Sequence, residues 1–378
     1  MSDGPLGFLR EGRLLLGRLQ RWRQRGVITE PSGRHVPRDD SPCALLVVGR
    51  LFDQHRPDAM MTCRLGYARA FEALGIPYLL CDWREIPETV ARLPRSFAMV
   101  FGADVPEMSV TVRRALATIP NTVWVNPWFE GERAFFAGHG LPVNIWAWPD
   151  AHRRAVLELQ PRFVFTATVP SGLVFFAGWE RAGVPVRSLP LACDMSLYQG
   201  EGLTDPAFDG VRLAFVGGYW ESKGRALDRY LRPFEDQLTI YGYNRWPYAG
   251  YRGRLERERE PMLYRQALVC PVVNEPTVAL LKGQINERVF KVLGCNGVPV
   301  VDAVPAYREL FAEDELLIPR DEVEFGEQVR WLLDDPVERA ERARRGRSAV
   351  LARHTYVHRA QAVLAGLGVD LPEISAQT

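Results

Sequence analysis

The sequence contains no uninterrupted apolar segment that approaches the roughly 20 residues needed to cross a bilayer. It also lacks the apolar region of a secretory signal peptide near its N-terminus, so we expect a cytoplasmic protein. The six cysteines are scattered without CxxC spacing, which favours reduced, mostly buried thiols. Because the formal net charge is only +1, no overall positive field attracts nucleic acid, and we expect no nucleic-acid partner.

Several catalytic motifs are absent as well. The chain has no GxGxxG dinucleotide fingerprint, no Walker A sequence, no Gly-x-Ser-x-Gly elbow and no HExxH zinc motif. Without the Gly-x-Ser-x-Gly elbow, no motif supports nucleophilic hydrolysis, and we predict no metal site. His354 and His358 are four residues apart on a predicted helix, a spacing that suits a metal ion. No third ligand lies near them in the sequence, so we interpret both as structural.

The length of 378 residues is too great for one ordinary core and predicts two domains of roughly 150–180 residues each. We place an N-terminal α/β domain at 43–195 and a C-terminal α/β domain at 205–354, with a polar joint around 200–210 between them. Residues 355–378 are predicted to form a helix that packs back across the joint, followed by a tail. The 47% hydrophobic and 25% charged content is typical of a soluble globular protein.

Residues 1–42 differ from the rest of the chain. Within 6–25, six arginines alternate with apolar residues that share one helical face, and 26–42 has the composition of a linker. A basic amphipathic helix of this kind can lie on an anionic membrane surface. The alternative is that it packs on the protein's own body or on a second copy in a homo-oligomer.

Apolar strand-like segments alternate with helix-like segments along both halves of the chain. We predict strands at 44–49, 78–81, 98–101, 122–125, 163–166, 211–218, 238–242, 269–273, 298–301 and 315–319. In the tail we predict helices at 324–333, 336–353 and 356–367. This alternation indicates an α/β fold with two Rossmann-like, doubly wound domains that face a cleft. Ligands bind beyond the carboxyl ends of such strands, so the loops after Val48, Val216 and Ile240 should face the cleft.

Glycine-rich loops follow two of the strands predicted in the second half. Glycine permits close approach of a ligand to the backbone, although a plain strand-to-helix turn is the alternative. We predict that the backbone of these loops lines a nucleoside pocket, with Tyr241 or Tyr251 beside the base. The predicted ligand-binding residues of these loops are Gly217, Gly218, Lys223, Tyr241, Gly242 and Gly253.

A helix start near residue 286 combines a capping residue with two cations. The side-chain oxygen of Asn286 can accept a free N–H of the first turn, and Gly297 can adopt the left-handed conformation that ends a helix. Arg288 and Lys291 lie close to the helix N-terminus, where positive charge is unfavourable unless an anion is present. We therefore predict a diphosphate site here, with Asn286, Glu287, Arg288 and Lys291 as its binding residues. The alternative is that Glu287 neutralises the two cations.

Asp53 and His55 lie in the loop after the first predicted strand. An imidazole beside a carboxylate at the carboxyl end of a strand can act as a general base. We therefore name Asp53 and His55 as the candidate catalytic residues. The alternative is that this histidine is simply solvated.

As a set, several segments resemble the GT-B glycosyltransferases of the CgeB-like, family 1/family 4-type group. The resemblance extends over about 160–365 and is carried by 189–194, 215–218, 238–242, 263–267, 286–290, 295–302 and 354–359. It implies a nucleotide-diphosphate sugar as co-substrate, held mainly by the second domain with Arg288 towards the diphosphate. It also implies hexosyl transfer, without an obligatory metal, to an acceptor held by the first domain. That acceptor can be a glycan, a lipid-linked molecule, a protein or a small molecule.

One position departs from the pattern of this group. Lys291 follows Phe290 where related enzymes usually carry a glutamate that contacts the ribose or sugar of the donor. The departure supports one alternative, a degenerate protein that binds a nucleotide sugar or serves as a scaffold. The other alternative is a non-hydrolysing sugar-nucleotide epimerase. The aromatic residues of the first domain favour a protein that binds an acceptor over an epimerase. The ordinary explanation of these tryptophans is that they belong to a hydrophobic core. The aromatic residues are Trp124, Trp128, Phe129, Trp146 and Trp148.

Overall fold

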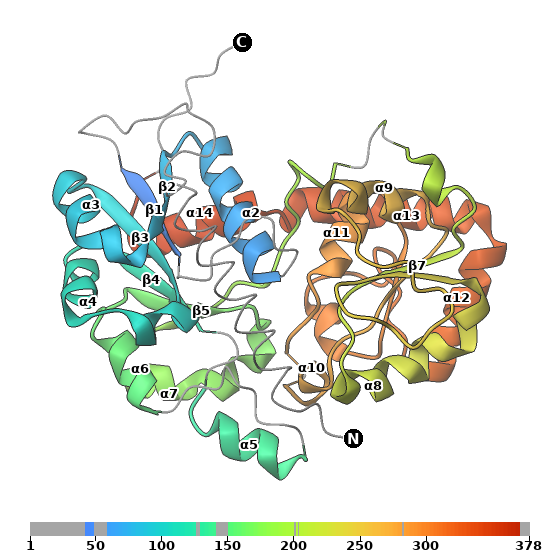
Figure 1. The fold of residues 1–378 in the computed structure, drawn as a ribbon, viewed down its shortest axis with the longest axis horizontal. Helices are drawn as coiled ribbons and strands as arrows, with labels where there is room; N and C mark the ends of the chain where they lie inside the picture. Colours follow the sequence, from blue (N-terminus) through green and yellow to red (C-terminus); the bar gives the residue numbers. More distant parts are fainter. Residues whose placement is uncertain are drawn as a thin grey trace, which may run out of the picture.

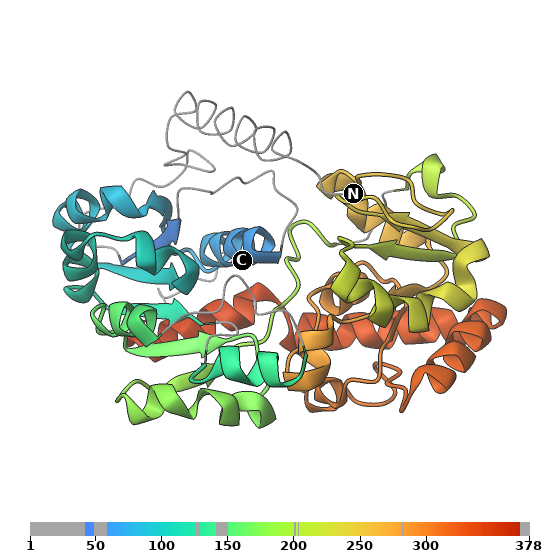
Figure 2. The same cartoon turned by 60° about the horizontal axis from the view of Figure 1, so that its bottom comes forward.

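The protein is described here by a computed structural model that covers 42–48, 59–125, 129–140, 150–199, 202, 204–281 and 283–370. Several predictions lie outside these residues. They concern the amphipathic helix at 6–25, the loop that carries Asp53 and His55, and Trp128, Trp146 and Trp148. Figure 1 shows two α/β lobes side by side, and Figure 2 shows the same separation after a rotation.

The first domain contains a six-stranded parallel sheet with the order β2-β1-β3-β4-β5-β6. The five strands predicted from the sequence are confirmed. The sixth, β6, was missed because it is only three residues long and its central residue, Arg187, is exposed. The strands are β1 (Cys43–Val48), β2 (Tyr78–Asp82), β3 (Ser96–Phe101), β4 (Asn121–Trp124), β5 (Phe163–Thr166) and β6 (Val186–Ser188).

Helices cover both faces of this sheet, so its central strands are buried along their whole length and are mostly apolar. On one face lies α2, which ends before Gly75, a residue in the left-handed conformation with φ of 69°. The other face is covered by α3, α4, α6 and α7. The helices are α2 (Ala59–Ala73), α3 (Ile86–Arg92), α4 (Val110–Ala117), α5 (Glu132–Gly138), α6 (Asp150–Leu157) and α7 (Ala177–Arg181).

The second domain contains two parallel strand pairs, β7 with β8 and β9 with β10, and a bridge from Leu213 to Val269 brings the pairs together. Their bounds are β7 (Leu213–Val216), β8 (Leu238–Tyr241), β9 (Cys270–Val272) and β10 (Pro299–Val301). The strand predicted at 315–319 is wrong. Although Leu316 and Ile318 are buried, the carbonyl of Ile318 accepts a hydrogen bond from Arg308 Nη2 at 3.0 Å, and Pro319 has no N–H for a ladder.

Helices again lie on both faces, with α8 and α12 on one side and α9, α11 and α13 on the other. They are α8 (Glu221–Leu231), α9 (Glu260–Gln266), α10 (Pro276–Leu281), α11 (Arg288–Gly294), α12 (Glu322–Asp334) and α13 (Pro336–Arg353). Beyond α11, the left-handed residue is Asn296, with φ of 60°, so its assignment to Gly297 is wrong. Gly297 is instead needed for space, because a Cβ there would meet Val292 Cγ1 at 3.0 Å.

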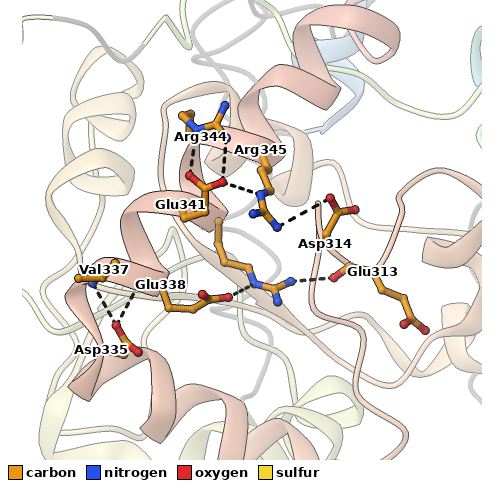
Figure 3. A network of polar contacts seen from close by, with 9 residues as sticks. Glu313, Asp314, Asp335, Val337, Glu338, Glu341, Arg344 and Arg345 are labelled. Carbon is orange, nitrogen blue, oxygen red and sulfur yellow. Dashed lines mark hydrogen bonds and ion pairs between the residues drawn. The ribbon is translucent and has the colours of Figure 1, made fainter.

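The charged face of α13 carries local ion pairs at the surface, as its sequence pattern predicts. Glu341 accepts hydrogen bonds from Arg344 and Arg345, and Arg345 also lies 3.8 Å from Asp314 (Figure 3). The hydrogen bonds from Arg344 and Arg345 lower the pKa of Glu341 to about 2. This face is solvated and makes no part of the cavity described below.

The last described helix, α14 (Tyr356–Leu367), belongs to the core of the first domain rather than the second. Its buried side chains, which include Val363 and Leu364, pack in one cluster with α2 and the strands β1, β3 and β5. In Figure 1 this red helix lies among the blue and green elements, whereas α13 lies in the other lobe. The end of the chain therefore ties the two domains together.

Candidate functional site

A cavity of about 300 Å³ lies between the two domains. Most of its wall comes from the second domain, from the loops after β7, β8 and β9 and from the segment that leads into α11. The first domain contributes Thr62 of α2, Ala167 after β5 and Leu191. The cavity is therefore at the carboxyl ends of strands, where ligands bind in such sheets.

The structure brings together most of the residues predicted to bind a ligand. Those that line the cavity are Gly217, Gly218, Lys223, Gly242, Asn286, Glu287, Arg288 and Lys291. Tyr241 and Gly253 do not line it. The ring of Tyr241 packs against Phe208 in the core, and Gly253 uses its carbonyl to accept the N–H of Gly242 at 2.8 Å.

Tyr251, predicted beside a base, also has another role. Its hydroxyl donates a hydrogen bond to the carbonyl of Gly242 at 3.0 Å and so helps to fix the loop after β8. The aromatic residues that do line the cavity are Tyr243, Trp220 and Tyr264; Tyr243 and Trp220 are 58% and 37% exposed, and Tyr264 is buried. The glycine-rich loops thus carry two aromatic rings into the cavity: Tyr243 lies two residues beyond the predicted Tyr241, and Trp220 was not predicted.

The glycines are required by close packing around a buried arginine. A Cβ on Gly217 would lie 2.7 Å from Arg288 Nη2, so any side chain there would displace the guanidinium. The carbonyl of Gly217 accepts a hydrogen bond from Trp246 Nε1 at 2.9 Å, which fixes the turn. Gly217 is therefore more than a plain strand-to-helix turn, because it leaves room for a cation beside the backbone.

Of the two cations predicted near the start of α11, Arg288 is the better placed to bind an anion. It is only 8% exposed, and its guanidinium lies 4.2 Å from the centre of the Phe215 ring. Its buried Nη1 has no hydrogen-bond partner. As predicted, the side chain of Asn286 accepts an N–H of the first turn, that of Arg288, at 2.9 Å. Since α11 has only seven residues, the charge presented to the cavity is mainly that of the guanidinium.

Lys223 supplies a second cation in the same wall. Its side chain is 4% exposed, and its ammonium lies 4.4 Å from the centre of the Trp220 ring and 3.5 Å from Glu275 Oε1. Burial lowers the pKa of Lys223 to about 8; the charge of Glu275 opposes this change, and the charge of Arg288 adds to it. Two cations that disfavour each other in a buried wall are stabilised by an anion between them.

Lys291 is neutralised from within the protein. Its Nζ lies 3.1 Å from Glu287 Oε2, and both side chains are nearly buried. Burial alone would lower the pKa of Lys291, but the charges of Glu260 and Glu287 raise it. The structure therefore separates the two predicted cations: Glu287 neutralises Lys291, the alternative named above, whereas Arg288 has no such carboxylate partner among the described residues.

Glu260 completes this buried group. Its two carboxylate oxygens accept hydrogen bonds from the hydroxyls of Tyr264, at 2.6 Å, and Tyr198, at 2.8 Å. Burial would raise the pKa of Glu260, but the charge of Lys291 and these hydrogen bonds lower it overall. Counting all charged side chains that line the cavity, five are cationic and three are acidic, so the wall favours an anion.

The sequence reasoning missed several residues of the site. Asn274 and Glu275 come directly after the strand predicted at 269–273, so the rule that led to Gly217 would have found them too. Glu260 and the arginines Arg254 and Arg257 lie on or before α9, where no local pattern marks them. These three reach the cavity only through tertiary packing.

The two histidines noted for their spacing have structural roles. His354 Nε2 contacts the carbonyl of Leu310 at 2.9 Å, and burial lowers the pKa of His354 to about 4. His358 forms a capping box with Thr355 at the start of α14. Within the part of the chain that the structure describes, no group of three or more His, Cys, Asp or Glu side chains could hold a metal ion.

Two Rossmann-like domains with a cavity at the carboxyl ends of their strands define the GT-B fold. Residues 218–365 match the model of a family described as glycosyl transferase-like. No curated protein sequence matches the chain.

Solved structures share the fold at low sequence identity. BGT of T4 phage, in complex with UDP and Mn²⁺, is 11% identical with a TM-score of 0.53, covering 87% of this chain and 100% of that one. Sucrose-phosphate synthase of Thermosynechococcus elongatus is 11% identical with a TM-score of 0.52, covering 87% and 97%. HepE of Anabaena, in complex with UDP-glucose, is 12% identical with a TM-score of 0.53, covering 86% and 99%. The predicted fold class is therefore confirmed.

Proposed function

We propose that the protein is a glycosyltransferase that moves a sugar from a nucleotide-diphosphate donor to an acceptor hydroxyl. The observation that carries this proposal is the buried guanidinium of Arg288, which has an unpartnered Nη1 in the wall of the interdomain cavity. The family match over 218–365 and fold relatives that bind UDP and UDP-glucose support it. Placement within the CgeB-like group, and transfer of a hexose in particular, are part of the proposal.

In this reaction, the bond between the anomeric carbon and the diphosphate oxygen breaks, and a bond to the acceptor oxygen forms. Negative charge develops on the departing diphosphate, where Arg288 and Lys223 stabilise it electrostatically. The acceptor proton passes to a general base, for which Asp53 and His55 remain the candidates from sequence. In a retaining enzyme the departing diphosphate takes it instead. The cavity between two domains orients donor and acceptor before they react.

We propose further that no metal ion is obligatory, because two protein cations already face the position of the diphosphate. BGT of T4 phage is known in complex with Mn²⁺, so the chain requires its own test. Turnover that is equal with EDTA and with added MnCl₂ supports metal independence, whereas a strict requirement for the metal contradicts it.

The experiment that tests the proposed function is a thermal-shift screen of the full chain against UDP, GDP, TDP and their sugars. We expect one nucleotide class to raise Tm. Arg288→Ala should weaken its binding by about 100-fold, because a charged hydrogen bond in a buried wall is lost. Arg344→Ala, on the solvated face of α13, is the matched control and should bind as the wild type does. The proposal is wrong if no nucleotide binds, or if Arg288→Ala binds equally well.

Product analysis separates the alternative functions. A transferase releases the free nucleotide diphosphate and needs an acceptor, whereas an epimerase converts the donor sugar without one. A scaffold protein binds without turnover. None of the described helices has the length and apolar character to pass through a membrane. A cytoplasmic location, membrane contact through 6–25 and a homo-oligomer all remain predictions.

A further inference from the structure

A second unpartnered group lies in the same cavity, and its chemistry is opposite to that of Arg288. Asn274 follows β9, lines the cavity and is only 2% exposed. Its buried side-chain oxygen, Oδ1, has no hydrogen-bond partner. A buried acceptor left without a partner is unfavourable, so this oxygen points to something that occupies the cavity.

The orientation of the Asn274 amide is fixed by its neighbours. Its Nδ2 donates to Asp302 Oδ1 at 2.6 Å and to the hydroxyl of Tyr307 at 3.0 Å, so both amide hydrogens are used. Its backbone N–H donates to Asp302 Oδ2 at 2.9 Å. If the amide were turned over, its oxygen would face the Asp302 carboxylate, and two acceptors would repel each other. The hydrogen bonds therefore leave Oδ1 as the end of the amide that has no hydrogen-bond partner among the described residues.

The support behind this amide is rigid. Asp302 comes directly after β10, which pairs with β9, and its N–H donates to the carbonyl of Val272 at 3.1 Å. Asp302 and Tyr307 are buried and do not line the cavity, whereas Asn274 does. The nitrogen of the amide thus faces the protein, and its oxygen is left on the side of the cavity.

Because the amide oxygen of Asn274 accepts a hydrogen bond, its partner in the cavity must be a hydrogen-bond donor. The oxygens of an ionised diphosphate carry no hydrogen, so they cannot bind Asn274 Oδ1, whereas they suit the N–H groups of Arg288. Arg288 and Asn274 both line the cavity, and the charge of Arg288 acts to lower the pKa of Asp302, the carboxyl that holds the Asn274 amide, so the guanidinium and the amide lie in one region of the cavity. One end of the region therefore suits an anion, and the other suits a hydroxyl.

We propose that Asn274 Oδ1 accepts a hydrogen bond from one hydroxyl of the sugar carried by the donor, and that this bond makes Asn274 a determinant of sugar specificity. The inference rests on the proposed function and deepens it. It assigns the diphosphate to the part of the cavity near Arg288 and the hydroxylated sugar to the part near Asn274. Asp302 and Tyr307 are positioning residues, since they act only through the amide.

The test compares binding of UDP and UDP-glucose to the full chain by calorimetry, in the wild type and in Asn274→Ala. If the thermal-shift screen selects another nucleotide, that nucleotide and its sugar replace the UDP pair. We expect Asn274→Ala to bind UDP within about twofold of the wild type but to bind UDP-glucose about tenfold more weakly. Arg288→Ala should weaken both ligands to the same extent, which separates the two ends of the cavity.

A second measurement begins with the wild-type protein, so its first result does not depend on whether Asn274→Ala folds. Among the monodeoxy analogues of UDP-glucose, we expect one to bind about tenfold more weakly than the parent, because it leaves Oδ1 without a partner. In Asn274→Ala this difference should disappear. If all monodeoxy analogues bind the wild type as tightly as UDP-glucose does, or if the loss persists in the variant, the inference is overturned.

These outcomes distinguish the inference from the proposed function on which it rests. If no nucleotide or nucleotide sugar of the screen binds, the proposed function fails and this inference fails with it. If UDP-glucose binds and Asn274→Ala weakens both ligands equally or neither, only the role of Asn274 is wrong.

Discussion

Tyr356, the first residue of α14, donates its phenol hydrogen to Glu287 Oε1 at 2.9 Å. This hydrogen bond joins the wall of the cavity to the helix that packs in the first domain. The ring of Tyr356 lies edge-on to that of Tyr67 in α2, with their centres 5.3 Å apart. One side chain therefore connects the buried ion pair of the site with the core of the opposite domain.

Removing only this hydroxyl should destabilise the protein without changing its packing. We expect Tyr356→Phe to lower the free energy of unfolding by about 1–3 kcal/mol, because a buried carboxylate oxygen loses its donor. Urea denaturation measures the change. Tyr78→Phe, which removes a half-buried hydroxyl that makes no hydrogen bond to the described residues, is the control and should differ from wild type by less than about 0.5 kcal/mol. Equal stability of the two variants would contradict the link.

The ion pair itself gives a second prediction, which separates structure from binding. Lys291→Met should lower stability by about 3–5 kcal/mol, since Glu287 and Glu260 are left in a buried site without their cation. The double variant Glu287→Gln/Lys291→Met should recover part of that loss, because one of the two charges is gone. Thermal unfolding measures both. A variant that keeps its stability but no longer binds the nucleotide would show instead that Lys291 serves the diphosphate.

The sequence was sufficient to predict most of the fold, because apolar periodicity is a local property. It marks α13 at its observed bounds and five strands of the first sheet. Where a buried segment resembles a strand but its polar backbone is satisfied by side chains, as at Ile318, the same signal misleads. Where a strand is short and carries an exposed Arg187 at its centre, the signal is too weak.

The site could be predicted only in part, for a related reason. The glycine loops and Arg288 follow from the rule that ligands bind at the carboxyl ends of strands. The fate of Lys291 depends on Glu260, which comes from another helix, and no sequence pattern gives their distance. The fixed amide of Asn274 likewise depends on residues 28 and 33 positions away. Electrostatic pairing in a buried wall is a tertiary property.

Lys223 should make nucleotide binding depend on pH. Because burial lowers its pKa to about 8, the side chain is positively charged below that pH and loses its charge as the pH rises through about 8. We expect the Kd for the selected nucleotide diphosphate to rise between pH 7 and pH 9. Since a bound anion favours the charged form of Lys223, the pKa of Lys223 should be higher in the complex than in the free protein.

A matched pair of variants tests this assignment by calorimetry at both pH values. Lys223→Arg keeps its charge throughout the range and should show little pH dependence. Lys223→Met should bind more weakly at pH 7 and should also be nearly independent of pH. If Lys223→Met retains the pH dependence of the wild type, another group is responsible.

Glu132 at the start of α5 should make the free energy of unfolding depend on pH, at lower pH values than those at which Lys223 titrates. It is 2% exposed, and neither carboxylate oxygen has a side-chain partner among the described residues; burial raises its pKa from 4.5 to about 7, against a smaller lowering by the backbone of Phe129. Its protonated form is favoured in the folded state. The stability it contributes is therefore fully present below about pH 4.5 and is lost as the pH rises through about 7.

Glu132→Gln removes this titration while keeping the shape of the side chain. At pH 5 the variant and the wild type should have similar unfolding free energies, and at pH 8 the variant should be more stable by about 3 kcal/mol. Urea denaturation at the two pH values measures the difference. Glu180→Gln, at an exposed position of α7, is the control and should follow the wild type at both. A constant difference between Glu132→Gln and wild type would mean that this carboxyl is already ionised at pH 5.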